Sequence, residues 1–392
     1  MGILFAASAT WACSGASEHL QRTSVRDSSG VVIVESASPL WPASQGWQVT
    51  PQPAVEIGAA EGAPEFEFQT ILGLTRLANG NIVVGNRGTR ELRFFSPEGQ
   101  FIRAVGRDGE GPGEFRTFNG VYPYRADSLI IWDYRLFRWS VFDSAGAFAR
   151  ILRPARPGMN PRSLSPLADG SLIIADNYLE DAGEQTVDYI RFFRFSPEGE
   201  LLDSLGIFRS SERFRPANGD SIAMSRIFGS TLLRAGAPEG FLLGFSAEYE
   251  VVDHAADGQV RRRIQWLGPD RTVTLEDVAA YRSDFIARQG TSQLGQQFAR
   301  FVSEVPAADQ FPAYSVMVRD RVGNVWLATY PRPDRSGPRT WTVLDPDGRW
   351  LGGVELPERL SVWDIGDRYV LGVMDDELGV EHVRMYELNK QD

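Results

Sequence analysis

The sequence predicts an all-β protein, a six-bladed β-propeller, from three observations. A hairpin motif recurs along the 392-residue chain at intervals of roughly 50 residues. A second kind of apolar strand precedes each hairpin. A glycine-rich segment occurs twice, as IGAAEGAPEF at 57–66 and as GRDGEGPGEF at 106–115, and we call each copy a connector. Together these features indicate repeated small β-sheets joined by one type of link.

The hairpins share one plan, in which a polar turn ending in glycine separates two hydrophobic runs. They are FFSPEGQF at Gly99, VFDSAGAF at Gly146, RFSPEGEL at Gly199, VDHAADGQV at Gly258 and VLDPDGRW at Gly348. Such a pattern is typical of two antiparallel strands with a tight turn between them. They are expected to be the third and fourth strands of successive blades.

The strand that precedes each hairpin is an almost unbroken apolar run. Six runs are present: ANGNIVVGN, ADSLIIWD, ADGSLIIAD, PEGFLLGF, VGNVWLAT and GDRYVLGV. An unbroken run predicts a strand buried on both faces. A period of about 40 to 50 residues with four short strands predicts a propeller blade.

The two connectors link the outer strand of one blade to the inner strand of the next. Residues 47–56, WQVTPQPAVE, read as an outer strand with no blade before it, whereas the last blade has only three strands. We therefore expect the N-terminal strand to pair with the last blade and close the ring, which removes exposed sheet edges.

Two helices are predicted within residues 270–312, where the hairpin spacing widens. Thr274 and Asp277 have the spacing of a capping box before an apolar-periodic run. The helices would be inserted between blades four and five. They would either cover the mouth of the central channel or pack Phe285, Phe298 and Phe301 onto the blade surface.

The predicted organisation is a signal-like segment and flexible tail at 1–29 and one propeller at 30–390. Cys13 is the only cysteine, and it follows the apolar run ILFAASATWA. This segment resembles a bacterial lipoprotein signal, which implies lipidation of Cys13 and export to the periplasm or outer membrane. A cytoplasmic protein with an ordinary N-terminus is the alternative.

The blade pattern resembles the six-bladed propellers of the NHL-repeat group, particularly bacterial secreted or lipoprotein members. The residues that carry the resemblance are SGVVIVES near Gly30, the VEIG strand at Val55, GNIVVGN at 80–86 with residues 90–115, and the later RVGNVWLA. The resemblance covers roughly residues 30 to 390. It implies a fold more firmly than an activity, because propellers host unrelated functions.

Composition excludes several kinds of chemistry. The net charge of −11 and the pI near 5.0 argue against nucleic-acid binding, which needs a cationic surface. Lys390 is the only lysine among 40 basic residues, so neither a phosphate-loop lysine nor a Schiff-base lysine is available in the propeller. His19, His254 and His382 lack the spacing of a zinc site.

One face of the propeller is predicted to carry the variable loops. The connectors and the turns between second and third strands emerge together there, and they are rich in Arg, Asp and Tyr. The candidate ligand-binding residues are Arg87, Arg90, Tyr134, Arg135, Tyr178, Tyr330 and Arg332, with Arg138 beside them. They suit carboxylate, sugar or peptide recognition. Alternatively, they are solvated and pair with neighbouring acids.

Four oxygen-bearing residues end the second strands of four blades. They are Asn86, Asp133, Asp176 and Asp375. A ring of such oxygens suits a hard cation such as calcium, and the similarity to six-bladed lactonase-type hydrolases implies a central metal. Alternatively, Asp and Asn at strand ends bond the backbone of the following turn.

These observations lead to two function hypotheses. The first is a non-enzymatic binding or scaffold propeller, exported and monomeric, which recognises a protein, peptide or glycan and needs no cofactor. A membrane would be reached only through a lipid anchor. The alternative is a hydrolase or lyase of propeller type with calcium or another divalent cation in the channel.

Overall fold

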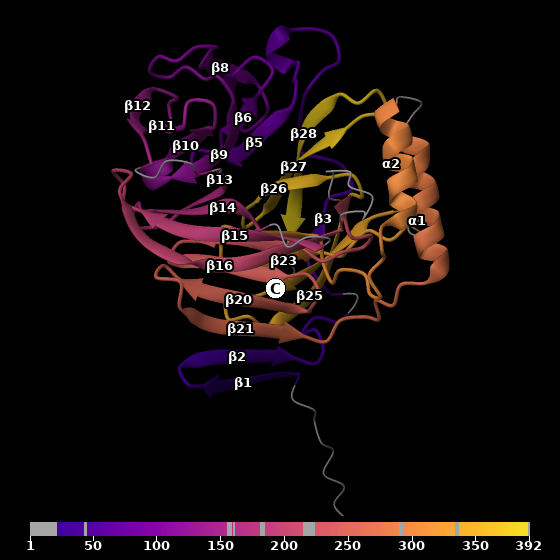
Figure 1. Ribbon diagram of the computed structural model, residues 1–392. Helices are drawn as coiled ribbons and strands as arrows, with labels where there is room; N and C mark the ends of the chain where they lie inside the picture. The colour runs from indigo at the N-terminus through magenta and orange to yellow at the C-terminus, as the bar shows by residue number, and fades with distance from the viewer. Residues whose placement is uncertain are drawn as a thin grey trace, which may run out of the picture.

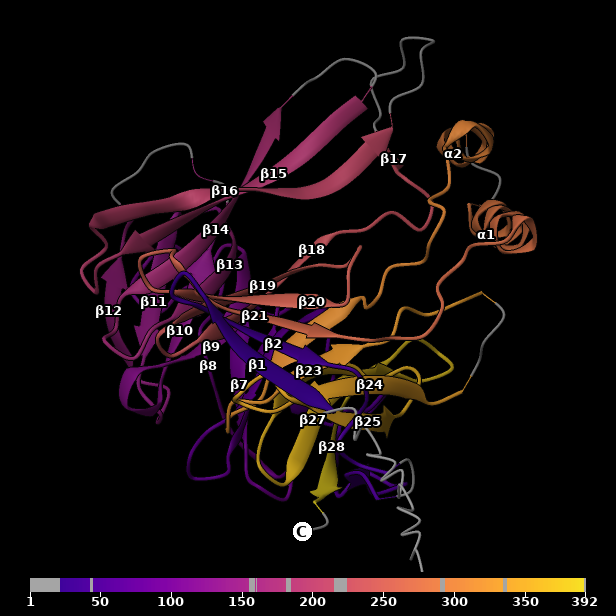
Figure 2. The same cartoon turned by 90° about the horizontal axis from the view of Figure 1, so that it is seen from below.

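The computed structural model describes residues 22–42, 45–154, 159, 161–180, 185–214, 224–289, 293–333 and 337–390. Within them the strands form six sheets that follow one another around a ring (Figures 1 and 2). The fold is therefore the six-bladed β-propeller that the repeats predict. Cys13 and the rest of the segment before Arg22 lie outside the described residues.

The first three blades are antiparallel sheets in chain order. Blade one holds β5 (Ile71–Arg76), β6 (Ile82–Asn86), β7 (Glu91–Phe95) and β8 (Phe101–Val105). Blade two holds β9 (Phe118–Tyr124), β10 (Ser128–Asp133), β11 (Arg138–Phe142) and β12 (Phe148–Leu152). Blade three holds β13 (Pro161–Pro166), β14 (Leu172–Glu180), β15 (Gln185–Phe195), β16 (Leu201–Phe214) and the short β17 (Met224–Ser225).

The last three blades repeat the arrangement. Blade four holds β18 (Leu232–Ala237), β19 (Gly240–Phe245), β20 (Glu250–Ala255) and β21 (Val260–Trp266). Blade five holds β22 (Val316–Arg319), β23 (Val325–Ala328), β24 (Arg339–Leu344) and β25 (Trp350–Leu356). Blade six holds β26 (Ser361–Ile365), β27 (Tyr369–Asp375) and β28 (Glu381–Asn389).

The N-terminal segment closes the ring as the sequence predicts. The strands β3 (Gln48–Val49) and β4 (Val55–Ile57) both pair antiparallel with β28. Ile57 lies opposite Val383, and the backbone amide of Ala54 donates to the carbonyl oxygen of Met385 at 2.7 Å. The first and last segments of the propeller therefore share one sheet.

A hairpin before this closure is not predicted by the repeats. The strands β1 (Thr23–Ser28) and β2 (Val31–Ser36) join blade four, because β2 pairs in parallel with the outer strand β21. Blade four thus becomes a six-stranded sheet. Strand β1 thus lies within residues 1–29, which the sequence analysis assigned to a signal-like segment and flexible tail.

The core lies between neighbouring blades. The second strands are buried on both faces, as their apolar runs indicate, and Ile82, Val83 and Val84 of β6 are fully buried. Seven clusters of buried side chains fill the spaces between blades and beneath the helices. Close packing of this kind makes the blades a rigid support for the turns at either end.

The two predicted helices are present between β21 and β22. They are α1 (Leu275–Arg288) and α2 (Gln293–Glu304), and Thr274 and Asp277 form the capping box at the start of α1. Both lie at the margin of the molecule in the two views (Figures 1 and 2). Phe285 packs against a buried cluster that includes Phe228 and Phe311, and Phe301 is 5% exposed, as the packing interpretation expects of these two rings. In the described part of the chain, neither helix has the length and hydropathy of a membrane span.

The turns divide between two faces of the ring. We call the face with the connectors and the turns between second and third strands the connector face, exemplified by residues 87–90, 106–117 and 134–137. The opposite short-turn face holds the turns between first and second and between third and fourth strands, such as 77–81 and 96–100. On blade three the expected loop 176–189 is instead mostly an extension of β14 and β15, which pair as far as Glu180 and Val187.

Candidate functional site

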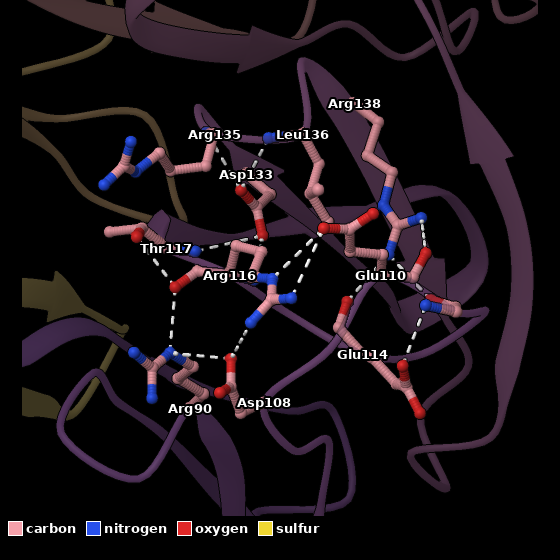
Figure 3. A network of polar contacts seen from close by, with 11 residues as sticks. Arg90, Asp108, Glu110, Glu114, Arg116, Thr117, Asp133, Arg135, Leu136 and Arg138 are labelled. Carbon is pink, nitrogen blue, oxygen red and sulfur yellow. Dashed lines mark hydrogen bonds and ion pairs between the residues drawn. The ribbon is translucent and has the colours of Figure 1, made fainter.

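The recurrent connector surrounds a buried arginine. Arg138, at the start of β11, is only 2% exposed. Its Nη1 donates to the carbonyl oxygen of Glu110 at 2.7 Å, and its Nη2 donates to those of Gly111 at 2.7 Å and Glu114 at 2.8 Å (Figure 3). The sequence analysis grouped Arg138 with arginines exposed on the loops of the connector face, but in the structure it is buried. It satisfies carbonyls of a connector that lacks regular secondary structure.

The earlier connector is built in the same way. Arg93 of β7 is 4% exposed, and its Nη1 donates to the carbonyl oxygens of Pro64, Glu65 and Glu67 at 2.9, 3.0 and 2.7 Å. In each case the connector wraps an arginine from the third strand of the blade that it introduces. This shared contact gives a physical reason for the repetition of the connector in the sequence.

Asp133 organises the neighbouring turn from the end of β10. Its Oδ2 accepts from the backbone amides of Arg116 at 2.7 Å and Thr117 at 3.2 Å. Its Oδ1 accepts from those of Arg135 at 3.0 Å and Leu136 at 3.1 Å (Figure 3). One fully buried carboxylate thus ties the connector to the turn of blade two.

The other residues of the candidate metal ring have different surroundings. Asn86 accepts from the backbone amide of Gln69 at 2.8 Å and donates to Thr89 Oγ1 at 3.0 Å. The buried Asp176 pairs with Arg191 at 2.5 Å, whereas Asp375 is exposed at the end of β27. Within the residues that the structure describes, no three His, Cys, Asp or Glu side chains are grouped so as to hold a metal. The turn-bonding interpretation matches the contacts of Asn86 and Asp133.

The turn that Asp133 fixes presents aromatic side chains to solvent. We call residues 134–137 the recognition turn. Tyr134 is 41% exposed and Phe137 is 51% exposed, and Arg135 between them is also exposed. Phe137 has φ +47°, a backbone conformation that is costly for a bulky residue. The packing of the turn holds an aromatic ring outward at this cost.

An ionic network borders the recognition turn. Arg90 Nε donates to the carbonyl oxygen of Arg116 at 2.8 Å and lies 3.4 Å from Asp108 Oδ1. Arg116 in turn pairs with Asp108 at 3.2 Å and with Glu110 at 3.3 Å (Figure 3). These exposed pairs are individually weak. Arg90 is thereby engaged, whereas the exposed side chains of Arg87 and Arg135 form no ion pair with any other described residue.

Tyr330 and Arg332 belong to a different region. The Tyr330 ring lies 5.9 Å from that of Phe311, and the Arg332 guanidinium lies 4.9 Å above the same ring. Burial raises the pKa of Tyr330. Both residues thus pack beside the helical insertion, apart from the recognition turn. Tyr178 pairs with Tyr189 in β14 and β15, and its side chain lies outside the described residues.

The sequence predicted that all the candidate arginines and tyrosines share one rim. The structure places Arg87, Arg90, Tyr134 and Arg135 on the turns of blades one and two, and Tyr330 and Arg332 elsewhere. The sequence analysis did not single out Phe137 and Arg116. The signal for Phe137 was available, because it lies in the turn Tyr-Arg-Leu-Phe between two strands rather than within a strand. The role of Arg116 had no such signal, since it depends on the folded connector.

Comparison with known proteins supports the architecture in part of the chain. A family model described as a 6-bladed beta-propeller matches residues 61–138. No curated protein matches the sequence.

Solved structures of similar shape have little sequence identity to this chain. A Bacteroides fragilis protein described as exported is 10% identical, with a TM-score of 0.49, and the match covers 92% of this chain and all of that one. A gluconolactonase from Xanthomonas campestris is 13% identical with a TM-score of 0.41, over 90% and 100% of the two chains. A virginiamycin B lyase from Staphylococcus aureus is 8% identical with a TM-score of 0.40, over 88% and 99%. These values carry no argument about activity.

Proposed function

We propose that this chain is a non-enzymatic binding propeller that recognises a carboxylate-bearing protein, peptide or glycan at the recognition turn. The observation that carries the proposal is the set of four amide hydrogen bonds to Asp133, which hold the turn while Tyr134 and Phe137 remain exposed. Buried polar groups fix the backbone of the turn, and the Phe137 ring lies edge-on to the buried Trp132, with ring centroids 6.2 Å apart, while half of its surface stays exposed.

The chemistry of the turn suits such a partner. An arginine fork bonds a carboxylate through two parallel hydrogen bonds. Exposed tyrosine and phenylalanine rings supply contact area with little loss of side-chain entropy. Because the turn is already ordered, a partner does not have to offset the entropy of ordering it.

The enzymatic alternative requires a cation in the channel. The oxygens of Asn86 and Asp133 already accept backbone hydrogen bonds, so their contacts favour a role in the turns. Export, with or without lipid on Cys13, remains part of the proposal. Mass spectrometry of the mature N-terminus tests the lipid.

The binding proposal is tested with arrays of acidic peptides and acidic oligosaccharides probed with purified protein. The decisive variant is Phe137→Gly, because glycine adopts φ +47° readily and the variant should keep its fold. We expect it to lose about tenfold or more in affinity, as should the double charge reversal Arg87→Glu with Arg135→Glu.

The matched control is Arg368→Glu, an exposed arginine on the short-turn face between β26 and β27. It should bind like the unmodified protein. Equal losses in the control and in Phe137→Gly, or no ligand captured by the unmodified protein, would rule out the recognition turn as the binding site.

A further inference from the structure

On the short-turn face, the turns between first and second strands are joined to the neighbouring blade by hydrogen bonds at five of the six junctions. From blade one onward, the five hydrogen bonds are as follows: the amide of Ala78 donates to Asp127 Oδ1 at 3.0 Å, the Tyr124 hydroxyl to the carbonyl oxygen of Gly170 at 2.8 Å, and the amide of Ala168 to the carbonyl oxygen of Pro238 at 2.8 Å. The amide of Arg321 donates to the carbonyl oxygen of Ile365 at 3.0 Å, and the amide of Arg76 to Asp364 Oδ2 at 2.9 Å. Between blades four and five, the described turns 237–240 and 319–323 exchange no hydrogen bond, and the two blades are joined on this face by a bond from Arg262 Nη1 to the carbonyl oxygen of Pro346 at 2.7 Å.

A pocket of about 320 Å³ lies at the junction of blades four and five. Leu242, Ile264 and Val325 line it with buried apolar surface, at 4%, 3% and 3% exposed. Val32 of the N-terminal hairpin also lines it. The volume, and the combination of apolar and charged side chains in the lining, suit a small molecule that carries both kinds of group.

Arg319 lines the same pocket and is half-buried. Its guanidinium forms no hydrogen bond or ion pair with the other described residues. Burial lowers its pKa, while the charges of Asp320 and Asp253 raise it. A guanidinium partly removed from water without a bonded partner has lost solvation that nothing in the protein replaces.

The nearby carboxylates are already engaged. Both oxygens of Asp320 accept hydrogen bonds, from Asn324 and Trp326 among others, at 2.6 to 3.1 Å. Asp253 pairs with Arg261 at 2.7 Å. Glu239 also lines the pocket and lies 3.4 Å from Arg261. Of the three arginines that line the pocket, Arg261 pairs with Asp253 and Arg262 Nη1 donates to the carbonyl oxygen of Pro346 at 2.7 Å, whereas the guanidinium of Arg319 has no bonded partner among the described residues.

We propose that this pocket binds a small organic carboxylate with an apolar tail. The Arg319 guanidinium receives the carboxylate through paired hydrogen bonds, and the tail rests on Leu242, Ile264 and Val325. This site is on the opposite face from the recognition turn and does not depend on the function proposed there.

The probes are phenylacetate and hexanoate, measured by isothermal titration calorimetry on the full chain. Phenethylamine and hexanol have similar tails without the carboxylate. We expect at least one of the two acids to bind at one site and the amine and alcohol not to bind. Failure of both acids to bind at about 10 mM, or equal binding of the matched amine, would overturn the proposal.

Arg319→Met retains the apolar stem and removes the charge, so affinity for the acid should fall about tenfold or more. Arg150→Met, in the exposed part of β12, is the matched control and should bind as the unmodified protein does. Equal affinity in Arg319→Met would reject the role of that guanidinium.

A second variant tests the location without touching the charge. Val32 is 36% exposed on the pocket wall, and Val32→Trp places a large ring at this wall while Arg319 remains. It should also weaken acid binding by about tenfold. Unchanged affinity in Val32→Trp would place the ligand elsewhere and overturn the proposal even if Arg319→Met were poorly folded.

Discussion

At the residue scale, the buried arginines show how an irregular segment becomes part of the fold. A glycine-rich connector has many carbonyl oxygens without strand or helix partners, and water does not reach those beneath it. The guanidinium of Arg138 or Arg93 bonds three of them at once. The connectors were predictable from their repetition, but the role of these arginines was not. An arginine in a strand is expected to be exposed to solvent, unless the segment that covers it is known.

Replacement of Arg138 by methionine should destabilise the protein strongly. The side chain retains similar bulk, but three buried carbonyls lose their donor, and each unsatisfied group costs about 1 to 3 kcal/mol. We expect the free energy of unfolding to fall by roughly 3 kcal/mol or more, measured by urea denaturation.

Arg135→Met is the control for this substitution, since Arg135 is exposed in the same turn. Its effect on unfolding should stay within about 0.5 kcal/mol. Similar stability of the two variants would mean that the connector carbonyls find other partners.

At the scale of elements, strands with local signals were predictable and strands with distant partners were not. The second strands and the hairpins are defined by runs and turns within a few residues, and all the predicted blades are present. The β1 and β2 hairpin has the same local pattern as other hairpins. Its partner β21 begins at Val260, and parallel pairing at that separation leaves no periodic signal in the sequence.

Removal of residues 1–36 should leave the ring folded and make it self-associate. The hairpin lies outside the closure strands, so β3 and β4 still pair with β28. Without β2, however, the edge of β21 is uncovered, and an open edge pairs with other chains. Analytical ultracentrifugation should show concentration-dependent association of the truncated chain, with circular dichroism of a β-protein retained.

The full chain measured at the same concentrations is the control, and it should remain smaller than the truncated form. A truncated chain that stays monomeric would show that the exposed β21 edge is protected in another way. A truncated chain that unfolds would mean that the hairpin is required for the ring itself.

At the scale of the whole molecule, the sequence predicted the scaffold better than the site. The number of blades and the closure follow from repeated patterns that many residues support together. The site depends on single contacts: Asp133 and Asn86 occupy the positions expected of metal ligands, yet their oxygens receive backbone amides. Residue type at a strand end is compatible with both roles, and only the path of the turn distinguishes them.

Closure of the ring should control the stability of all six blades. Ile57 in β4 is 1% exposed and packs with Ile82, Val84 and Leu371, so it joins the last sheet to the first blade. The substitution Ile57→Asp puts an unpaired charge into this cluster, which is strongly unfavourable. We expect a loss of about 3 kcal/mol or more in urea denaturation, together with faster proteolysis throughout the propeller.

The control for this prediction is the adjacent Glu56→Gln, since Glu56 is exposed on the same strand and its partners are Arg384 at 3.2 Å and His382 at 3.4 Å. Its cost should be about 1 kcal/mol or less. If Ile57→Asp made only β4 and β28 sensitive to protease while the other blades kept their protection, the blades would unfold independently, and closure would stabilise one sheet rather than the ring.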